Sequence, residues 1–345
     1  MLMRTFFSFR EHIKKNWATI LSSLVVGVLF GFFLFTPKIK NLTQLEGKPL
    51  RIPDINYPLI NTLIGYDNAE ATNFGQLINF KAKIHDLIKK EIAQNNASTI
   101  SIYFRDLNAG RWISINGNES YMPASLLKVP LMITYYHLSE TNPLLLTKQI
   151  KYDGNGNFDD RQNIQPDKKL KAGENYTVEQ LINEMIIYSD NDSAELLLNN
   201  IGSEELNKMF KDMDIFLPGN LGAQDFLSVK NYALFLRILY GATYLNRTNS
   251  EKALELLSKS VFKDGLVSGV PDKTVVAHKF GEYKLLDPTN KNTIKSEFHD
   301  CGIIYYPQEP YLLCVMTKGD DLSKLEKSVS DISGLVYSEV DNQTN

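Results

Sequence analysis

A serine and a lysine three positions apart form the first pair in this chain that could do covalent chemistry. Ser125 and Lys128 bound the run Ser-Leu-Leu-Lys, which opens an apolar stretch with helical spacing. A serine at a helix start lies in the positive end of the helix dipole, which favours the alkoxide form. Residues i and i+3 share a helix face, so the amine of Lys128 can reach the hydroxyl and take its proton. The pair indicates a serine nucleophile with a lysine base.

The spacing of this pair is weak evidence by itself. Ser260 and Lys263 repeat it within the run Ser-Val-Phe-Lys, where we interpret it as a chance occurrence. Because the same spacing occurs twice, further motifs are needed before Ser125 can be assigned a role.

Two triplets further along the chain carry side chains that could complete such a site. Ser-Asp-Asn at 189–191 follows a helical run, and its residue types also suit a simple helix cap. Lys-Phe-Gly at 279–281 ends the β-branched run 274–277, and a lysine there also suits an edge strand. Each triplet alone fits a structural role as well as a functional one, so only their combination with Ser125 and Lys128 is informative.

Taken together and in this order, the three motifs resemble the set that marks class A β-lactamases and penicillin-binding proteins. The serine motif begins at 125, Ser-Asp-Asn begins at 189, and Lys-Phe-Gly begins at 279. The resemblance covers roughly residues 76–340. It implies an α+β fold, in which an antiparallel sheet is flanked by helices and carries an inserted helical subdomain.

The periodicity of apolar residues agrees with such a fold. In chain order, the predicted elements are a helix at 76–94, strands at 99–107 and 112–115, a helix-rich middle at 125–262, strands at 274–279, 302–306 and 311–317, and a helix at 322–337. Strands at both ends of a helix-rich middle suit one sheet with an inserted lobe and a cleft between the two.

The resemblance implies three catalytic residues. Ser125 would attack an amide carbonyl and carry the acyl group, and Lys128 would take the serine proton. Ser189 would relay that proton to the leaving nitrogen, which requires a hydroxyl that bridges two lysines.

The resemblance also implies the residues that bind substrate. Asn191 would hold the substrate amide, Lys279 would provide positive charge near the substrate carboxylate, and Gly281 would let the substrate lie against its strand. The backbone N–H groups of Ser125 and Glu282 would form the oxyanion hole. No metal ion and no organic cofactor is expected.

The sequence departs from the family pattern at two points. The Glu-x-x-Leu-Asn loop, which supplies the base for deacylation in class A β-lactamases, has no counterpart here. Asp225 is the one acid in the corresponding loop and is therefore the candidate for the deacylation base. Phe280 stands where the family has threonine or serine, so a hydroxyl that bonds the β-lactam carboxylate is missing. Both departures predict slow turnover.

The functional prediction is therefore a serine hydrolase that forms an acyl-enzyme on Ser125 with β-lactams or related amides and deacylates slowly. One alternative is a D-alanyl-D-alanine peptidase that acts on peptidoglycan stem peptides. Another is a binding module of the cell wall without turnover. The formal net charge of −3 leaves no basic excess for phosphates, so a nucleic-acid partner is not expected.

Near the N-terminus, residues 17–35 contain no charged residue. At about 1.5 Å per residue such a helix would span roughly 28 Å, enough for the hydrocarbon core of a bilayer. No small-residue cleavage site follows, so an uncleaved signal anchor is predicted. The predicted organisation is a cytoplasmic tail at 1–16, a transmembrane anchor at 17–35, an extracytoplasmic linker at 36–75 and an extracytoplasmic hydrolase domain at 76–340, held at the cell membrane.

The two cysteines lie in neighbouring strand patterns. Cys301 and Cys314 occur in apolar runs that are separated by Pro-Gln-Glu-Pro, which predicts two strands of a hairpin with the sulfurs opposite each other. Two buried free thiols and one cross-strand disulfide both fit this pattern, and the disulfide requires an oxidising compartment.

Ser125 is predicted to be the acylated residue, and Ser260 offers an internal control with the same spacing to a lysine. A labelled penicillin or fluorophosphonate should attach to a tryptic peptide that contains Ser125, as checked by mass spectrometry of the digest. The label should be lost in Ser125→Ala and kept in Ser260→Ala, because only the first serine begins the full motif set. Labelling with the opposite dependence would overturn the assignment.

Overall fold

The computed structural model describes residues 57–61, 74–155, 162–220, 224–287, 289 and 292–344. Its main sheet is antiparallel and has the strand order β2-β1-β7-β6-β5. The strands are β1 (Thr99–Asp106), β2 (Trp112–Ile115), β5 (Val276–Leu286), β6 (Thr293–Ile304) and β7 (Tyr311–Gly319). A second, two-stranded sheet pairs β3 (Gln149–Lys151) with β4 (Asn175–Thr177).

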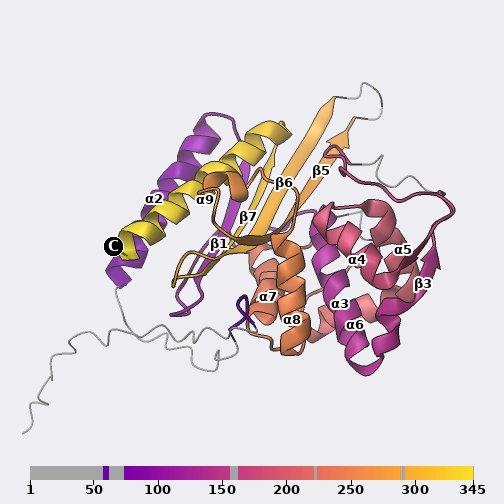
Figure 1. Cartoon of the computed structure of the whole chain (residues 1–345). Coiled ribbons are helices and arrows are strands. Elements are labelled where there is room, and N and C mark those ends of the chain that lie inside the picture. The colour runs from indigo at the N-terminus through magenta and orange to yellow at the C-terminus, as the bar shows by residue number, and fades with distance from the viewer. Residues whose placement is uncertain are drawn as a thin grey trace, which may run out of the picture. The chain divides into compact units, whose positions relative to one another are not determined.

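Two helices from opposite ends of the described chain cover one face of the sheet. They are α2 (Phe74–Ala93) and α9 (Leu322–Thr344), which lie side by side in Figure 1. Alternate residues of β1, namely Ile100, Ile102 and Phe104, share an apolar core with both helices. Successive strand residues point to opposite faces, so Tyr103 joins the core on the other face.

The other face packs against a helical subdomain that is inserted between β2 and β5. In chain order it contains η1 (Ala124–Leu127), α3 (Lys128–Thr141), η2 (Pro143–Thr147), α4 (Val178–Ile187), α5 (Asn191–Ile201), α6 (Ser203–Asp212), α7 (Val229–Tyr240) and α8 (Arg247–Ser258). The 3-10 turn η4 (Val267–Gly269), which follows them, contacts α9 on the first face. Helix α7 contacts β7, β1 and β6, while α8 contacts β5. The predicted α+β class with an inserted helical subdomain is therefore confirmed.

The hairpin of β5 and β6 is longer than the strand patterns predicted. Strand signals covered 274–279 and 302–306, whereas the strands occupy 276–286 and 293–304. Charged and polar side chains such as Glu297, His299 and Asp300 interrupt the apolar pattern, yet all three are fully buried. Hydropathy cannot identify a strand whose buried polar groups are satisfied by partners elsewhere in the fold.

Part of the predicted linker contacts the helical subdomain. Residues 57–61 lie next to α7 and α8, where the N–H groups of Leu59 and Ile60 donate to the carboxylate of Glu251 at 3.0–3.1 Å. The N–H of Asn61 donates to the carbonyl of Tyr240 at 2.7 Å. This short piece of the region 36–75 is thus fixed by hydrogen bonds.

The predicted location at a cell membrane is contradicted. Within the described residues, no helix combines the length and the apolar character that a bilayer crossing requires. The stretch 17–35, on which that prediction was based, lies outside the described residues, as does the predicted tail at 1–16.

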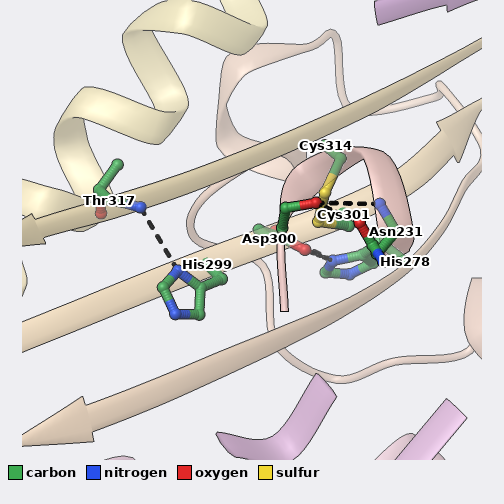
Figure 2. The surroundings of a disulfide bond; sticks show 8 residues. Asn231, His278, His299, Asp300, Cys301, Cys314 and Thr317 are labelled. Atoms are coloured by element: carbon green, nitrogen blue, oxygen red, sulfur yellow. Dashed lines mark hydrogen bonds and ion pairs between the residues drawn. A yellow bond between two sulfur atoms is a disulfide. The ribbon is translucent and has the colours of Figure 1, made fainter. Parts of the chain in front are cut away.

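The two cysteines form a disulfide between β6 and β7 (Figure 2). Cys301 and Cys314 are directly opposite in the strand register, and both side chains are fully buried. They face the core of the helical subdomain. Of the two arrangements that the sequence left open, the structure has the cross-strand disulfide.

Removal of this disulfide should destabilise the fold. The bond closes a short loop, and loss of such a constraint on the unfolded chain typically costs about 2–4 kcal/mol. We expect the double variant Cys301→Ala/Cys314→Ala to lose that much free energy of unfolding, measured by urea denaturation at equilibrium. Wild type unfolded with and without reductant provides the control. Equal unfolding midpoints for wild type and the double variant would contradict this expectation.

Candidate active site

Ser125 lies in the 3-10 turn η1, immediately before α3. The preceding residue, Ala124, has a φ of 46°, a left-handed conformation that is uncommon outside glycine. The N–H of Leu126 donates to the carbonyl of Pro123 at 3.0 Å. A Cβ on Gly281 of β5 would lie only 2.8 Å from that carbonyl oxygen. Gly281 therefore makes room for the turn that carries the serine, in addition to the predicted role of making room for substrate.

Strand β6 holds the chain just before this turn. The N–H of Met122 donates to Glu297 Oε2 at 2.9 Å, and His299 Nε2 lies 3.0 Å from the Met122 carbonyl oxygen. The N–H of Thr317 donates to His299 Nδ1, so the ring proton is on Nε2 and is donated to Met122 (Figure 2 shows the Thr317 bond). Glu297 and His299 are fully buried. Both backbone groups of Met122 are thus fixed to the sheet.

Lys128 is buried at the first residue of α3 and reaches the turn between α4 and α5. Its amine donates to the carbonyl of Ser189 at 2.5 Å, to the hydroxyl of Ser189 at 3.2 Å and to Asn191 Oδ1 at 2.6 Å. The structure therefore brings together residues of the first and second motifs. Asn191 contacts the lysine through its amide oxygen.

The hydroxyl of Ser189 lies between two lysine amines. Lys279 Nζ donates to Ser189 Oγ at 2.9 Å, on the same oxygen that Lys128 approaches. Ser189 has a φ of 59° and is almost fully buried. A left-handed backbone costs a residue with a Cβ about 1 kcal/mol or more, so tertiary contacts must hold it. Next to it, Asp190 is the N-cap of α5, and its side chain accepts a hydrogen bond from the N–H of Ser193.

Lys279 is a buried cation next to another cation. Burial lowers the pKa of Lys279 well below its ordinary value, and the positive charge of Lys128 lowers it further. Asp300 and Glu282 act in the opposite direction without cancelling these effects. A lysine in this state can exchange a proton with a neighbouring hydroxyl near neutral pH more readily than an exposed lysine.

A cavity of about 300 Å³ opens beside these groups. It is lined by Ala124, Ser125, Leu127, Lys128, Leu131, Gln162, Asn191, Ala194, Glu195, Leu198, Leu206 and Glu282. Both residues that were predicted to form the oxyanion hole, Ser125 and Glu282, are among them. In the part of the chain that the structure describes, no cluster of three or more side chains could hold a metal ion.

Comparison with known sequences identifies the family. A sequence model of the beta-lactamase enzyme family matches residues 79–340. This protein belongs to that family. Beta-lactamase VEB-1 of Pseudomonas aeruginosa is 23% identical over 304 residues, which cover 79% of this chain and 92% of VEB-1.

Solved structures of beta-lactamase family relatives share the fold. PBP-A superposes with a TM-score of 0.63 at 19% identity, covering 77% of this chain and 97% of PBP-A. A class A beta-lactamase from Mycobacterium abscessus gives a TM-score of 0.63 at 18% identity, covering 76% of this chain and 99% of that enzyme. At these identities the likeness shows the fold alone.

Phe280 occupies an apolar cluster in this beta-lactamase family member. Its ring is stacked on Phe262 with centroids 3.9 Å apart, and the amine of Lys279 lies 4.1 Å from its centroid. Phe280 is not among the described residues that line the cavity. The position therefore supplies packing, and its side chain offers no hydrogen-bond donor to a substrate carboxylate.

The side chain of Glu282 binds a neighbouring loop. Its Oε1 accepts from the N–H groups of Asn163 and Ile164 at 2.6 Å, and its Oε2 accepts from Asn163 Nδ2 at 2.9 Å. Glu282 therefore fastens this loop beside the cavity. This role of the side chain adds to the predicted role of the backbone N–H in the oxyanion hole.

Asp225 binds two lysines away from the cavity. Lys295 Nζ lies 2.8 and 2.9 Å from its carboxylate oxygens, and Lys318 Nζ lies 3.0 Å from Oδ2. Burial acts to raise the pKa of the Asp225 carboxyl, but the hydrogen bonds from the two lysines outweigh it and lower that pKa. Asp225 is not among the described residues that line the cavity, so the structure does not bring this candidate base to the other site residues.

Sequence reasoning missed two parts of the site. One is the buried pair Glu297 and His299, which fixes Met122 and has no sequence signal because the contacting residues are far apart in the chain. The other is Glu195, which lines the cavity with Ser125. Its position four residues after Asn191 in a helix was a usable signal, since residues i and i+4 share a helix face.

The lowered pKa of Lys279 predicts a distinct dependence of stability on pH. The unfolded chain binds this proton more tightly than the folded chain, so wild-type stability should rise with pH until the ordinary lysine value near 10.4. Lys279→Met removes this contribution. We expect the difference in free energy of unfolding, variant minus wild type, to fall as pH rises toward about 10 from below, measured by urea denaturation.

Lys263→Met is the matched control for the change in net charge, because Lys263 belongs to the second serine–lysine pair and bonds only the Ser260 carbonyl among described residues. A difference between Lys279→Met and wild type that stayed constant across this pH range would contradict the burial argument.

Proposed function

We propose that this protein is a serine hydrolase that forms an acyl-enzyme on Ser125 with β-lactams or related amides, and that the acyl-enzyme hydrolyses slowly. The observation that carries the proposal is the Ser189 hydroxyl, which lies between the amines of Lys128 and Lys279. A hydroxyl between two amines can accept a proton on one side and donate one on the other. Acylation requires such a relay, because Ser125 loses a proton when it attacks and the leaving nitrogen of the substrate gains one.

In the proposed acylation, Lys128 acts in its neutral form: Ser125 Oγ attacks the amide carbonyl and its proton passes to the lysine amine. The carbonyl oxygen becomes an oxyanion, which the N–H groups of Ser125 and Glu282 would stabilise. The carbon–nitrogen bond then breaks, and the proton reaches the leaving nitrogen through Ser189. Asn191 would orient the substrate amide, and Lys279 would attract the substrate carboxylate.

Two features support slow release of the acyl group. Asp225 is bound by Lys295 and Lys318, and the lowered pKa of its carboxyl makes it a weak base. Phe280 replaces a hydroxyl whose bond to a charged group is typically worth about 1.5–3 kcal/mol. The contacts of Asp225 leave deacylation without the predicted water base. The replacement by Phe280 weakens binding of the β-lactam carboxylate.

A D-alanyl-D-alanine peptidase acting on peptidoglycan stem peptides is the second candidate. The binding of Asp225 by Lys295 and Lys318 favours it, because an enzyme without this water base would release a β-lactam acyl group slowly. PBP-A, which shares the fold of this chain, has been solved in a variant form as an acyl-enzyme with penicillin G. Slow β-lactam release and peptide hydrolysis are compatible with the same acylation machinery.

The prediction is a burst of product followed by a slow steady state. Because the predicted base Asp225 binds two lysines instead, deacylation should be slower than acylation by a factor of about 10²–10⁴. A pre-steady-state time course of nitrocefin with the full chain measures the burst, and intact mass after penicillin exposure detects the adduct. Ser125→Ala should abolish both, whereas Ser260→Ala should change neither.

The outcomes separate the candidates. Release of D-alanine from a stem peptide together with a persistent penicillin adduct would favour the peptidase. Linear nitrocefin turnover at tens per second without a burst would contradict slow deacylation. The absence of any adduct would contradict an acyl-enzyme and leave a binding module.

A further inference from the structure

Two carboxylates line the catalytic cavity among the described residues, Glu195 and Glu282. Hydrolysis of an ester on Ser125 requires a group that removes a proton from the attacking water, and a carboxylate near the ester can do this. Asp225, the candidate base that the sequence offered, binds Lys295 and Lys318 instead of lining the cavity. The two cavity carboxylates are therefore the relevant candidates.

Both carboxylate oxygens of Glu282 already accept hydrogen bonds. It accepts three hydrogen bonds from the loop at Asn163 and Ile164, which engage both of its oxygens. Glu282 is thus better suited to hold the loop than to activate water.

Glu195 lies on the face of α5 that lines the cavity. This face presents Asn191, Ala194, Glu195 and Leu198, which have the spacing of a single helix face. Asn191 at one end of the face contacts Lys128 at 2.6 Å, so Glu195 is one helical turn from a residue that touches the catalytic lysine.

The surroundings of Glu195 leave part of its carboxylate open to the cavity. Its Oε1 accepts a hydrogen bond from Asn199 Nδ2 at 3.1 Å, which orients the group from the next turn of the helix. The side chain is half-buried, and apolar residues of α3 and α6, Leu131 and Leu206, line the same space. A water molecule between this carboxylate and Ser125 would lie in a confined, partly apolar volume.

We propose that Glu195 is the general base for hydrolysis of the acyl group on Ser125, a step that rests on the proposed function. Water attacks the ester carbonyl while Glu195 takes one of its protons. The new carbon–oxygen bond forms, the bond between the acyl carbon and Ser125 Oγ breaks, and the proton returns to the serine oxygen. The products are a carboxylic acid and the free enzyme, so the slow turnover of this protein passes through Glu195.

The test separates acylation from deacylation in the full chain. Glu195→Gln keeps the shape of the side chain and the oxygen that accepts from Asn199, but removes the base. We expect the nitrocefin burst to keep its amplitude and to change in rate by no more than a few fold, while the steady-state rate falls by about 10²-fold. The lifetime of the penicillin adduct, followed by intact mass after removal of free penicillin, should lengthen by the same factor.

Three variants serve as controls. Glu195→Asp retains a carboxylate and should recover part of the steady-state rate. Asp225→Asn should leave the burst and the steady state unchanged, and so should Glu204→Gln, which changes an exposed acid in α6. Thermal unfolding of each variant checks that the fold is intact.

A normal burst with an unchanged steady-state rate in Glu195→Gln would refute the assignment of Glu195 and leave the acyl-enzyme in place. A steady-state rate that fell in Asp225→Asn instead would also refute it. The absence of burst and adduct in wild type would refute the proposed function itself, and the Glu195 assignment with it.

Discussion

The convergence of two buried lysine amines on one serine hydroxyl is the constraint on which the site depends. Lys128 and Lys279 carry like charges when both are protonated, and each is almost completely removed from water. Such an arrangement is unfavourable by itself, because burial and mutual repulsion both oppose the charged forms. The lowered pKa of Lys279 is the expression of that cost. The fold must therefore hold the amines against a force that would separate them.

The sheet provides this restraint with polar groups inside an otherwise apolar core. His278 and Asp300 form a buried pair at 2.8 Å across β5 and β6, directly beside Lys279 in the strand, and Figure 2 shows them next to the disulfide. On β6, Glu297 and His299 fix the backbone of Met122 by hydrogen bonds. Buried hydrogen bonds of this kind are costly to leave unmade, so they specify one position for the strand relative to the turn that carries Ser125.

Two residues at the site have a strained backbone. Ala124 and Ser189 both adopt left-handed φ values although each has a Cβ, and each lies directly at or before a serine of the site. Gly281 allows the turn of Ser125 to approach β5 within contact distance. Contacts with strands β5 and β6 thus hold the strained turn of Ser125 near the two lysines. This preorganises the groups that must react together.

The sequence alone determined the features that arise from local spacing. The order of the motifs identified the family, and helical or alternating periodicity located most helices and the strands β1, β2 and β7. The lysine one turn after Ser125 and the cap at Asp190 could be interpreted from the sequence for the same reason, since residues i, i+3 and i+4 meet in any helix.

Only the tertiary structure decided which distant groups meet. In the folded chain, Cys301 forms a disulfide with Cys314 and Asp225 binds two lysines. Phe280 stacks on Phe262, and Glu195 lines the cavity. These outcomes depend on strand register and on how the helical subdomain packs against the sheet. A shift of one residue in a strand moves every side chain to the other face, and no local pattern encodes that choice when both faces are buried.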